Sequence, residues 1–289
     1  MAPGVMRPYA AQTGAFLDFY VGDAETARRR LEEALRDGVP DPSAQARLLA
    51  LLAMIDAAEG EVEVASTRAE QAVQLARDSA DLQTLFYALG NAGDVAMTAG
   101  DAGLARERHV ECIERLQRLG LDWLSAAPHA RLGDLALSAG DHQRARMWYD
   151  RSIALWSARD LGPGAPQTLA GLARLDTVEG DLDSARRALD TALATAERCG
   201  SRGEYPWIAV GYAAVLAAAG RREESGILFG LGLRHGPRVG RDLRRLVDAE
   251  LAPFFALAAD DPWTSAEHPL VISTPLEDLP ALIEKLVAG

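Results

Sequence analysis

Residues 139–145 read AGDHQRA, and variants of this short pattern occur five more times along the chain. The other copies are VGDAETA at 21–27, EGEVEVA at 59–65, AGDAGLA at 99–105, EGDLDSA at 179–185 and AGRREES at 219–225. Their glycines are Gly22, Gly60, Gly100, Gly140, Gly180 and Gly220, which are 38 residues apart once and 40 apart thereafter. A fixed period of this length indicates a chain built from stacked structural repeats.

Small residues recur at three fixed distances from each turn glycine. They are Ala27, Ala65, Ala105, Ala145, Ala185 and Ser225 five residues after it, Ala34, Ala72, Cys112, Ser152, Ala192 and Gly232 twelve after it, and Ala15, Ala53, Gly93, Gly133, Ala173 and Ala213 seven before it. Closely packed antiparallel helices need small residues where they cross, because a larger side chain there costs about 1–3 kcal/mol. Each glycine is therefore predicted to be a turn between two packed helices, and the acidic residue that follows most of them is predicted to cap the second helix.

The predicted fold class is all-α, a right-handed superhelical array of six helix pairs over residues 1–235. The expected pairs are 8–20 with 23–37, 43–58 with 62–78, 83–98 with 102–119, 123–138 with 142–160, 166–178 with 182–198, and 206–218 with 222–235. Residues 236–289 are predicted to form capping helices and a tail. We expect a helix over 237–258, an irregular stretch over 259–272 and a final helix over 275–287 that begins at the capping box Thr274-Pro275-Leu276-Glu277.

The pattern of small residue, Gly-Asp turn and two later small residues resembles the tetratricopeptide repeat, whose usual unit has 34 residues. The longer unit found here, with Leu119-Gly120 or Cys199-Gly200 after the second helix, resembles the repeat regions of actinobacterial transcription regulators of the LuxR type and the antibiotic-regulatory type. The resemblance covers residues 8 to about 235 and implies a groove lined by the first helix of each pair. The regulators' phosphate-binding loop and basic recognition helix have no counterpart in this sequence.

Composition narrows the functional classes. The net charge is −12, whereas nucleic-acid binders normally carry a basic footprint. No apolar run reaches the roughly 18 residues that a membrane span needs, so we expect a cytoplasmic protein with no membrane or nucleic-acid partner. The two cysteines, Cys112 and Cys199, indicate neither a disulfide framework nor a zinc site. No metal-binding, nucleophile-elbow or phosphate-loop motif occurs, so we expect no cofactor and no enzymatic activity.

The candidate binding residues lie on the first helices. Six residues before the glycines stand Phe16, Met54, Asp94, Asp134, Arg174 and Ala214, so charge is confined to the middle repeats. Tyr87 and Trp207 are expected nearby, which makes the predicted binding set Tyr87, Asp94, Asp134, Arg174 and Trp207. Successive groove positions are expected about 10 Å apart. These charges could recognise a ligand, or they could line the groove and pair between helices.

Three other features are open to two interpretations each. The aromatic face of Tyr9, Phe16 and Tyr20 could cap the first repeat or form a lip on the groove. Arginines near the end of the array could be a solvated flank or a docking patch for an acidic partner; they are Arg221, Arg222, Arg234, Arg238, Arg241 and Arg245. His109 occupies a slot filled by apolar or aromatic residues elsewhere, so we interpret it as a packed histidine.

The leading functional hypothesis is a non-catalytic binding module, used in bacterial regulation, whose groove holds a peptide, a protein segment or a small effector. One alternative is a small-molecule sensor or enzyme with a pocket enclosed by the superhelix. Another is a structural scaffold for oligomerisation. The mixed aromatic, apolar and charged groove favours the first two hypotheses over the third, and a homo-oligomer is compatible with any of them.

Overall fold

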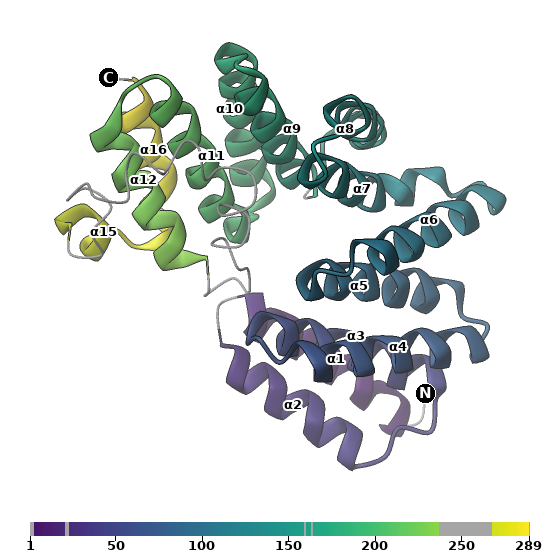
Figure 1. The fold of residues 1–289 in the computed structure, drawn as a ribbon. Helices are drawn as coiled ribbons and strands as arrows, with labels where there is room; N and C mark the ends of the chain where they lie inside the picture. Colours follow the sequence, from purple (N-terminus) through teal and green to yellow (C-terminus); the bar gives the residue numbers. More distant parts are fainter. Residues whose placement is uncertain (1–2, 21–22, 159, 163, 237–267, 289) are drawn as a thin grey trace. The chain divides into compact units, whose positions relative to one another are not determined.

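The computed structural model describes residues 3–20, 23–158, 160–162, 164–236 and 268–288. These residues form α-helices and short 3-10 helices, and no strand occurs among them. The six predicted pairs are α1 (Pro3–Tyr20) with α2 (Ala24–Arg36), α3 (Pro42–Ala58) with α4 (Val62–Asp78), α5 (Leu82–Ala99) with α6 (Ala102–Arg118), α7 (Ala126–Ser138) with α8 (His142–Ser157), α9 (Ala165–Glu179) with α10 (Leu182–Cys199), and α11 (Tyr205–Ala218) with α12 (Arg222–His235). The predicted all-α array of helix pairs is confirmed (Figure 1).

The predicted helix ends agree with the structure to within a few residues, with three informative differences. Helix α1 begins at Pro3 rather than at residue 8. Helix α8 ends at Ser157 because Asp160 and Leu161 take positive φ angles of 57° and 47°. The fourth repeat begins with a 3-10 turn, η1 (Asp122–Ser125), before α7 starts.

Turn and cap chemistry explains where the helices start and stop. The turn glycines from Gly60 onward have φ between 72° and 88°, a left-handed conformation that costs other residues steric strain. After Gly100, Gly140 and Gly180, an aspartate accepts a hydrogen bond from a backbone N–H in the first turn of the next helix. Glu61 makes no such bond, in keeping with the preference of N-caps for short side chains. Asp81 caps α5 in the same way, accepting from Gln83 N and Thr84 N.

The small positions lie where the two helices of a repeat cross. Ala65, Ala105, Ala145 and Ala185 are completely buried. Seven residues before the turn, Gly93 and Gly133 face the aromatic rings of His109 and Tyr149, and a Cβ added to either glycine would lie 2.5 or 2.7 Å from the ring. The first, second and fifth repeats have alanine at this position and an aliphatic partner, Leu31, Ala69 or Leu189. The sixth repeat combines Ala213 with Phe229, so alanine does not exclude a ring there; in the third and fourth repeats, the missing methyl group is what lets the ring come this close.

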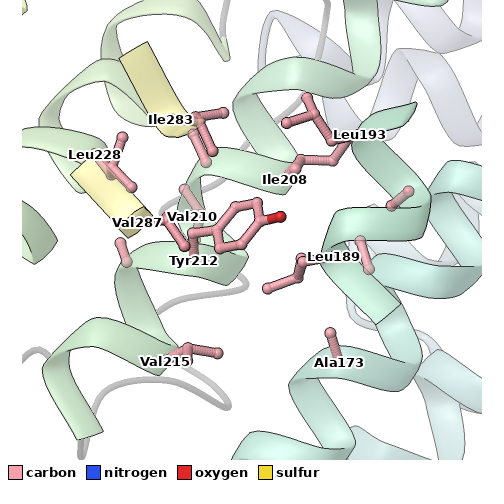
Figure 2. Close-up of a cluster of buried hydrophobic side chains, with 14 of the residues drawn as sticks. Ala173, Leu189, Leu193, Ile208, Val210, Tyr212, Val215, Leu228, Ile283 and Val287 are labelled. Carbon is pink, nitrogen blue, oxygen red and sulfur yellow. The ribbon is translucent and has the colours of Figure 1, made fainter. Parts of the chain in front are cut away.

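The chain divides into two compact bodies, and the boundary falls inside α7. The N-terminal body contains the described residues up to Arg131, and the C-terminal body contains the described residues from Leu132 onward. The division between array and cap predicted at residue 235 is not tested by this and stays a prediction. The core of the C-terminal body gathers Leu189, Ile208, Tyr212 and Leu228 with side chains from the tail (Figure 2).

The tail packs on the last repeat through α16 (Leu279–Ala288), whose Leu279, Ile283 and Val287 are buried. The predicted start of this helix at Pro275 is wrong: residues 276–278 form a 3-10 turn, η6 (Leu276–Asp278), and the α-helix begins at Leu279. A helix starting at residue 275 would place Pro280 in its interior, where proline has no N–H to donate. A short helix, α15 (Pro269–Ser273), also replaces part of the predicted irregular stretch.

Two of the C-terminal arginines hold this tail in place. Arg221 donates to the carbonyl oxygens of Leu286 at 2.7 Å and Val287 at 3.2 Å, and Arg234 donates to that of Thr274 at 3.3 Å. These two side chains are therefore engaged within the protein. Arg238, Arg241 and Arg245, together with the predicted helix over 237–258, lie outside the described residues. Within the described part of the chain, no helix is both long enough and apolar enough to cross a membrane.

Removing the cap of α5 is expected to destabilise the protein. Burial alone would raise the pKa of Asp81, but hydrogen bonds from Thr84, Ser43 and Gln83 outweigh it and hold the pKa below its ordinary value of 3.8. Asp81→Ala should therefore lower the free energy of unfolding by about 1 kcal/mol at pH 7. The difference should be full above pH 3.8 and vanish as the pH falls through the lowered pKa of the folded state. Urea unfolding across that range measures it. Glu61→Ala, at a cap position without a side-chain bond, is the control and should change little.

The pairing of glycine with a ring can be tested by a double-mutant cycle. Gly133→Ala should destabilise the protein by about 1–3 kcal/mol because the new methyl group meets the Tyr149 ring. Tyr149→Leu restores the combination found at Ala173 and Leu189, so the double variant should be more stable than the sum of the two single effects predicts. Strict additivity in urea unfolding would show that the ring and the glycine do not interact.

Candidate functional site

A groove in the N-terminal body runs along α5. It has a volume of about 680 Å³ and is bounded by α5, α6, the turn η1 and the first residues of α7. Its lining residues are Leu82, Gln83, Phe86, Tyr87, Gly90, Asn91, Asp94, His109, Cys112, Leu116, Leu121, Trp123, Leu124, Ala127, Pro128 and Arg131. All of them belong to the N-terminal body, and most of them are apolar.

The groove exists because the start of the fourth repeat does not close over α5. Sixteen residues before the turn glycine, Ala44 and Thr84 are buried in the second and third repeats, with 3% and 0% of their surface exposed. The equivalent Leu124 belongs to the 3-10 turn and is 41% exposed. Leu82 and Trp123, 44% and 40% exposed, also lie on the rim. The result is an apolar groove with an apolar, solvent-facing rim.

One end of the groove is polar. Arg131 Nε donates to Asp94 Oδ1 at 2.8 Å, and His109 Nε2 lies 3.7 Å from the same oxygen. His109 is buried, as predicted for a packed histidine, and its ring reaches the carboxylate by crossing over Gly93. The carboxylate itself remains about one third exposed, so it is accessible from the groove.

Asn91 is the buried amide of the groove. It is 91% buried, and its Nδ2 nitrogen makes no hydrogen bond within the described part of the protein. Burial raises the pKa of the neighbouring Tyr87, against the opposing effect of the Asn91 and Gln12 side chains, so the phenol is neutral. A buried donor without an acceptor is unfavourable by about 1–3 kcal/mol. The groove therefore presents an amide that a bound acceptor would satisfy.

Cys112 lies in the wall of the groove. Burial raises the pKa of the Cys112 thiol to about 12, so this thiol is protonated at neutral pH and is a poor nucleophile. Among the described residues, no cluster of three or more histidine, cysteine, aspartate or glutamate side chains could hold a metal ion.

Two of the five predicted site residues belong to the N-terminal body and three to the C-terminal body. Tyr87 and Asp94 line the groove in the N-terminal body. In the C-terminal body, Asp134 Oδ1 accepts from Arg174 Nη2 at 2.6 Å and from the Tyr149 hydroxyl at 2.8 Å, and the Arg174 guanidinium lies 5.9 Å from the centre of the Trp207 ring. Successive groove positions were expected about 10 Å apart, but the Arg174 side chain is long enough to reach Asp134 from the neighbouring position. Asp134 and Arg174 thus form the interhelical pair that was one of the two interpretations, and their contact with a ligand stays a prediction.

Several groove residues were missed by sequence reasoning. Asn91 carries a usable signal, since it is the only asparagine in the chain and the equivalent residue of the second repeat is Leu51. Trp123 and Leu124 carry a weaker one, because large apolar residues there precede the proline of a helix start. Phe86 has no distinguishing feature in the sequence.

These observations define a tetratricopeptide-type repeat protein with an open groove on its third and fourth repeats. No family model matches the chain, and no curated protein matches it. The chain is similar in structure to a Rap protein complexed with competence and sporulation factor, with a TM-score of 0.74, 16% identity and coverage of 100% of this chain and 78% of that one.

Two further solved structures share the fold. Aspartyl phosphate phosphatase F from Bacillus subtilis aligns with a TM-score of 0.60 at 12% identity, over 88% of this chain and 70% of that chain. A signal transduction ATPase with a tetratricopeptide repeat sensor, from Pyrococcus horikoshii, aligns with a TM-score of 0.57 at 16% identity, over 87% of this chain and 43% of that chain. At these identities the likeness establishes the helical repeat fold.

The Asp134–Arg174 pair is expected to stabilise the protein. Arg174 is only 5% exposed and donates to Asp134, so Asp134→Asn removes a charged partner of a nearly buried guanidinium and should cost about 3 kcal/mol in the free energy of unfolding. The exposed pair of Glu114 and Arg118 provides the control, and Glu114→Gln should cost less than about 1 kcal/mol. Equal urea midpoints for the two variants would show that the Asp134–Arg174 pair does not stabilise the protein.

Proposed function

We propose that this protein is a binding module whose groove on the third and fourth repeats holds a peptide or a segment of another protein. The observation that carries the proposal is the buried Asn91 amide, which lacks an acceptor in a groove that is otherwise largely apolar. A peptide could satisfy both the amide and the apolar wall of the groove. Its backbone carbonyl oxygen accepts a hydrogen bond from the amide, and its side chains cover the apolar wall.

The rim favours an extended ligand over a small enclosed one. Leu82, Trp123 and Leu124 are exposed beside the cavity, and a ligand that continued past the cavity would bury them. The cavity volume also lies within the range of small-molecule sites, about 300–1,000 Å³, which keeps a small effector as the second candidate.

The proposal also includes a regulatory role for the protein. The Rap protein with the same fold was crystallised with competence and sporulation factor, and the ATPase carries its tetratricopeptide repeats as a sensor. The long repeat also resembles the repeat regions of actinobacterial regulators. We infer that this chain acts as the sensing or docking part of a bacterial regulatory system, in which binding to the groove is the signal.

A random peptide library displayed on phage and panned against the full chain tests the proposal. Enriched peptides, synthesised with a fluorophore, should bind the wild-type chain, and Asn91→Ala should weaken their binding about tenfold, which is about 1.4 kcal/mol. The melting temperature of this variant should not fall, because the deleted amide nitrogen has no partner to lose. Gln117→Ala, which removes an exposed amide from α6 outside the groove, is the matched control. Peptides that bind equally well to wild type and Asn91→Ala would place the binding surface elsewhere.

A further inference from the structure

The first three repeats build a stack of alternating rings and charge at one equivalent position. Thirteen residues before their turn glycines stand Tyr9, Arg47 and Tyr87. The Arg47 guanidinium lies 5.8 Å from the centre of the Tyr9 ring and 5.6 Å from the centre of the Tyr87 ring. Its Nε donates to Gln12 Oε1 at 2.9 Å, which fixes its orientation. A guanidinium between two aromatic faces is electrostatically favourable.

The stack stops at the groove. The equivalent residue of the fourth repeat is Ala127, which is exposed and has no side chain beyond Cβ. Tyr87 lines the groove, so its ring contacts Arg47 from within the protein and also borders the cavity. In a stack that alternates ring, cation and ring, the next member after Tyr87 is a cation.

A carboxylate is available at the same place. Within the described part of the chain, both contacts of the Asp94 carboxylate fall on Oδ1, which leaves Oδ2 for a ligand. The C-terminal body shows the complete arrangement, since Arg174 is bonded to Asp134 and lies over Trp207. In the groove, Arg131 is bonded to Asp94 and Arg47 lies over Tyr87, so no single guanidinium among the described residues joins the carboxylate to the ring.

We propose that the groove recognises an arginine side chain of the bound segment, stacked on Tyr87 and paired with Asp94 Oδ2. This inference rests on the proposed function and specifies the chemistry of the ligand at the same site. Arginine fits better than lysine because its planar guanidinium can stack on a ring while it donates to a carboxylate. The backbone carbonyl near that residue is then placed to accept from Asn91.

The charges that line the groove are compatible with a second positive charge beside Arg131. Arg131 and Asp94 are the charged residues among those that line the groove, and their charges cancel. A bound arginine adds one positive charge, which the ring of Tyr87 and the net charge of −12 of the whole chain offset. The ring of Tyr87 and the carboxylate of Asp94 favour a cationic group, whereas Arg131 is the one lining residue that would favour an anionic group.

The single asparagine of the chain makes the site directly observable. Selective ¹⁵N-asparagine labelling yields one side-chain NH₂ signal, that of Asn91. The probes are N-acetyl-L-arginine N-methylamide and its citrulline counterpart, which has nearly the same shape and no charge. Titration of the full chain should shift the Asn91 signal, with the arginine probe binding about fivefold more tightly than the citrulline probe.

Two variants separate the ring from its hydroxyl group. Tyr87→Phe keeps the aromatic face and should keep the preference for arginine over citrulline, whereas Tyr87→Leu should abolish it. If Tyr87→Leu does not fold, Asp94→Asn serves instead and should reduce the same preference. A loss of preference in Tyr87→Phe equal to that in Tyr87→Leu would overturn the stacking.

The outcomes also separate this inference from the proposed function. Equal affinities of the two probes, or an Asn91 signal that moves with panned peptides and not with the arginine probe, overturn the arginine inference and leave the binding groove intact. An Asn91 signal that neither probe nor panned peptide moves overturns both.

Discussion

The close crossing of the two helices within each repeat is the constraint on which the rest of this structure depends. In the fifth repeat, where Ala173 lies seven residues before the turn, Leu189 is the partner, and in the sixth repeat Ala213 is combined with Phe229. Where glycine lies there, a ring enters: His109 crosses over Gly93 toward Asp94, and Tyr149 crosses over Gly133 to bond Asp134. The loss of one methyl group thus lets a polar ring approach the helix crossing, as it does at Asp94 and at Asp134.

The helices could be predicted because their determinants are local and repeated. A left-handed glycine, an aspartate cap and small residues at the helix crossing each determine the structure of only a few neighbouring residues. The same pattern recurs in every repeat, so each repeat supports the prediction independently. Prediction failed where one residue changed the local outcome. Pro280 delayed the last helix to Leu279, and positive φ angles at Asp160 and Leu161 shortened α8. Neither feature belongs to the repeat, so periodicity carried no information about it.

The site was less predictable because residues at equivalent positions of different repeats reach different partners. Asp94 and Asp134 occupy equivalent positions, yet Asp94 bonds Arg131 beside a groove and Asp134 bonds the nearly buried Arg174. The sequence grouped Tyr87 and Asp94 with Asp134, Arg174 and Trp207; the structure places the first two in the N-terminal body and the other three in the C-terminal body, and their role in binding stays a prediction. The hydrogen-bonding state of Asn91 depends on what its neighbours leave unpaired, which no single-sequence pattern reports.

The groove is better understood as a retained feature than as a packing defect. Apolar surface left in water is unfavourable by about 25 cal/mol per Å², and Leu82, Trp123 and Leu124 all expose such surface at one rim. A larger residue at Ala127 would reduce the opening without disturbing a helix, since α7 begins just before it. The chain instead keeps a small residue there and a buried amide without an acceptor at Asn91, and both features weaken the free protein. Natural proteins keep such local conflicts mainly at functional sites, because a bound partner resolves them together.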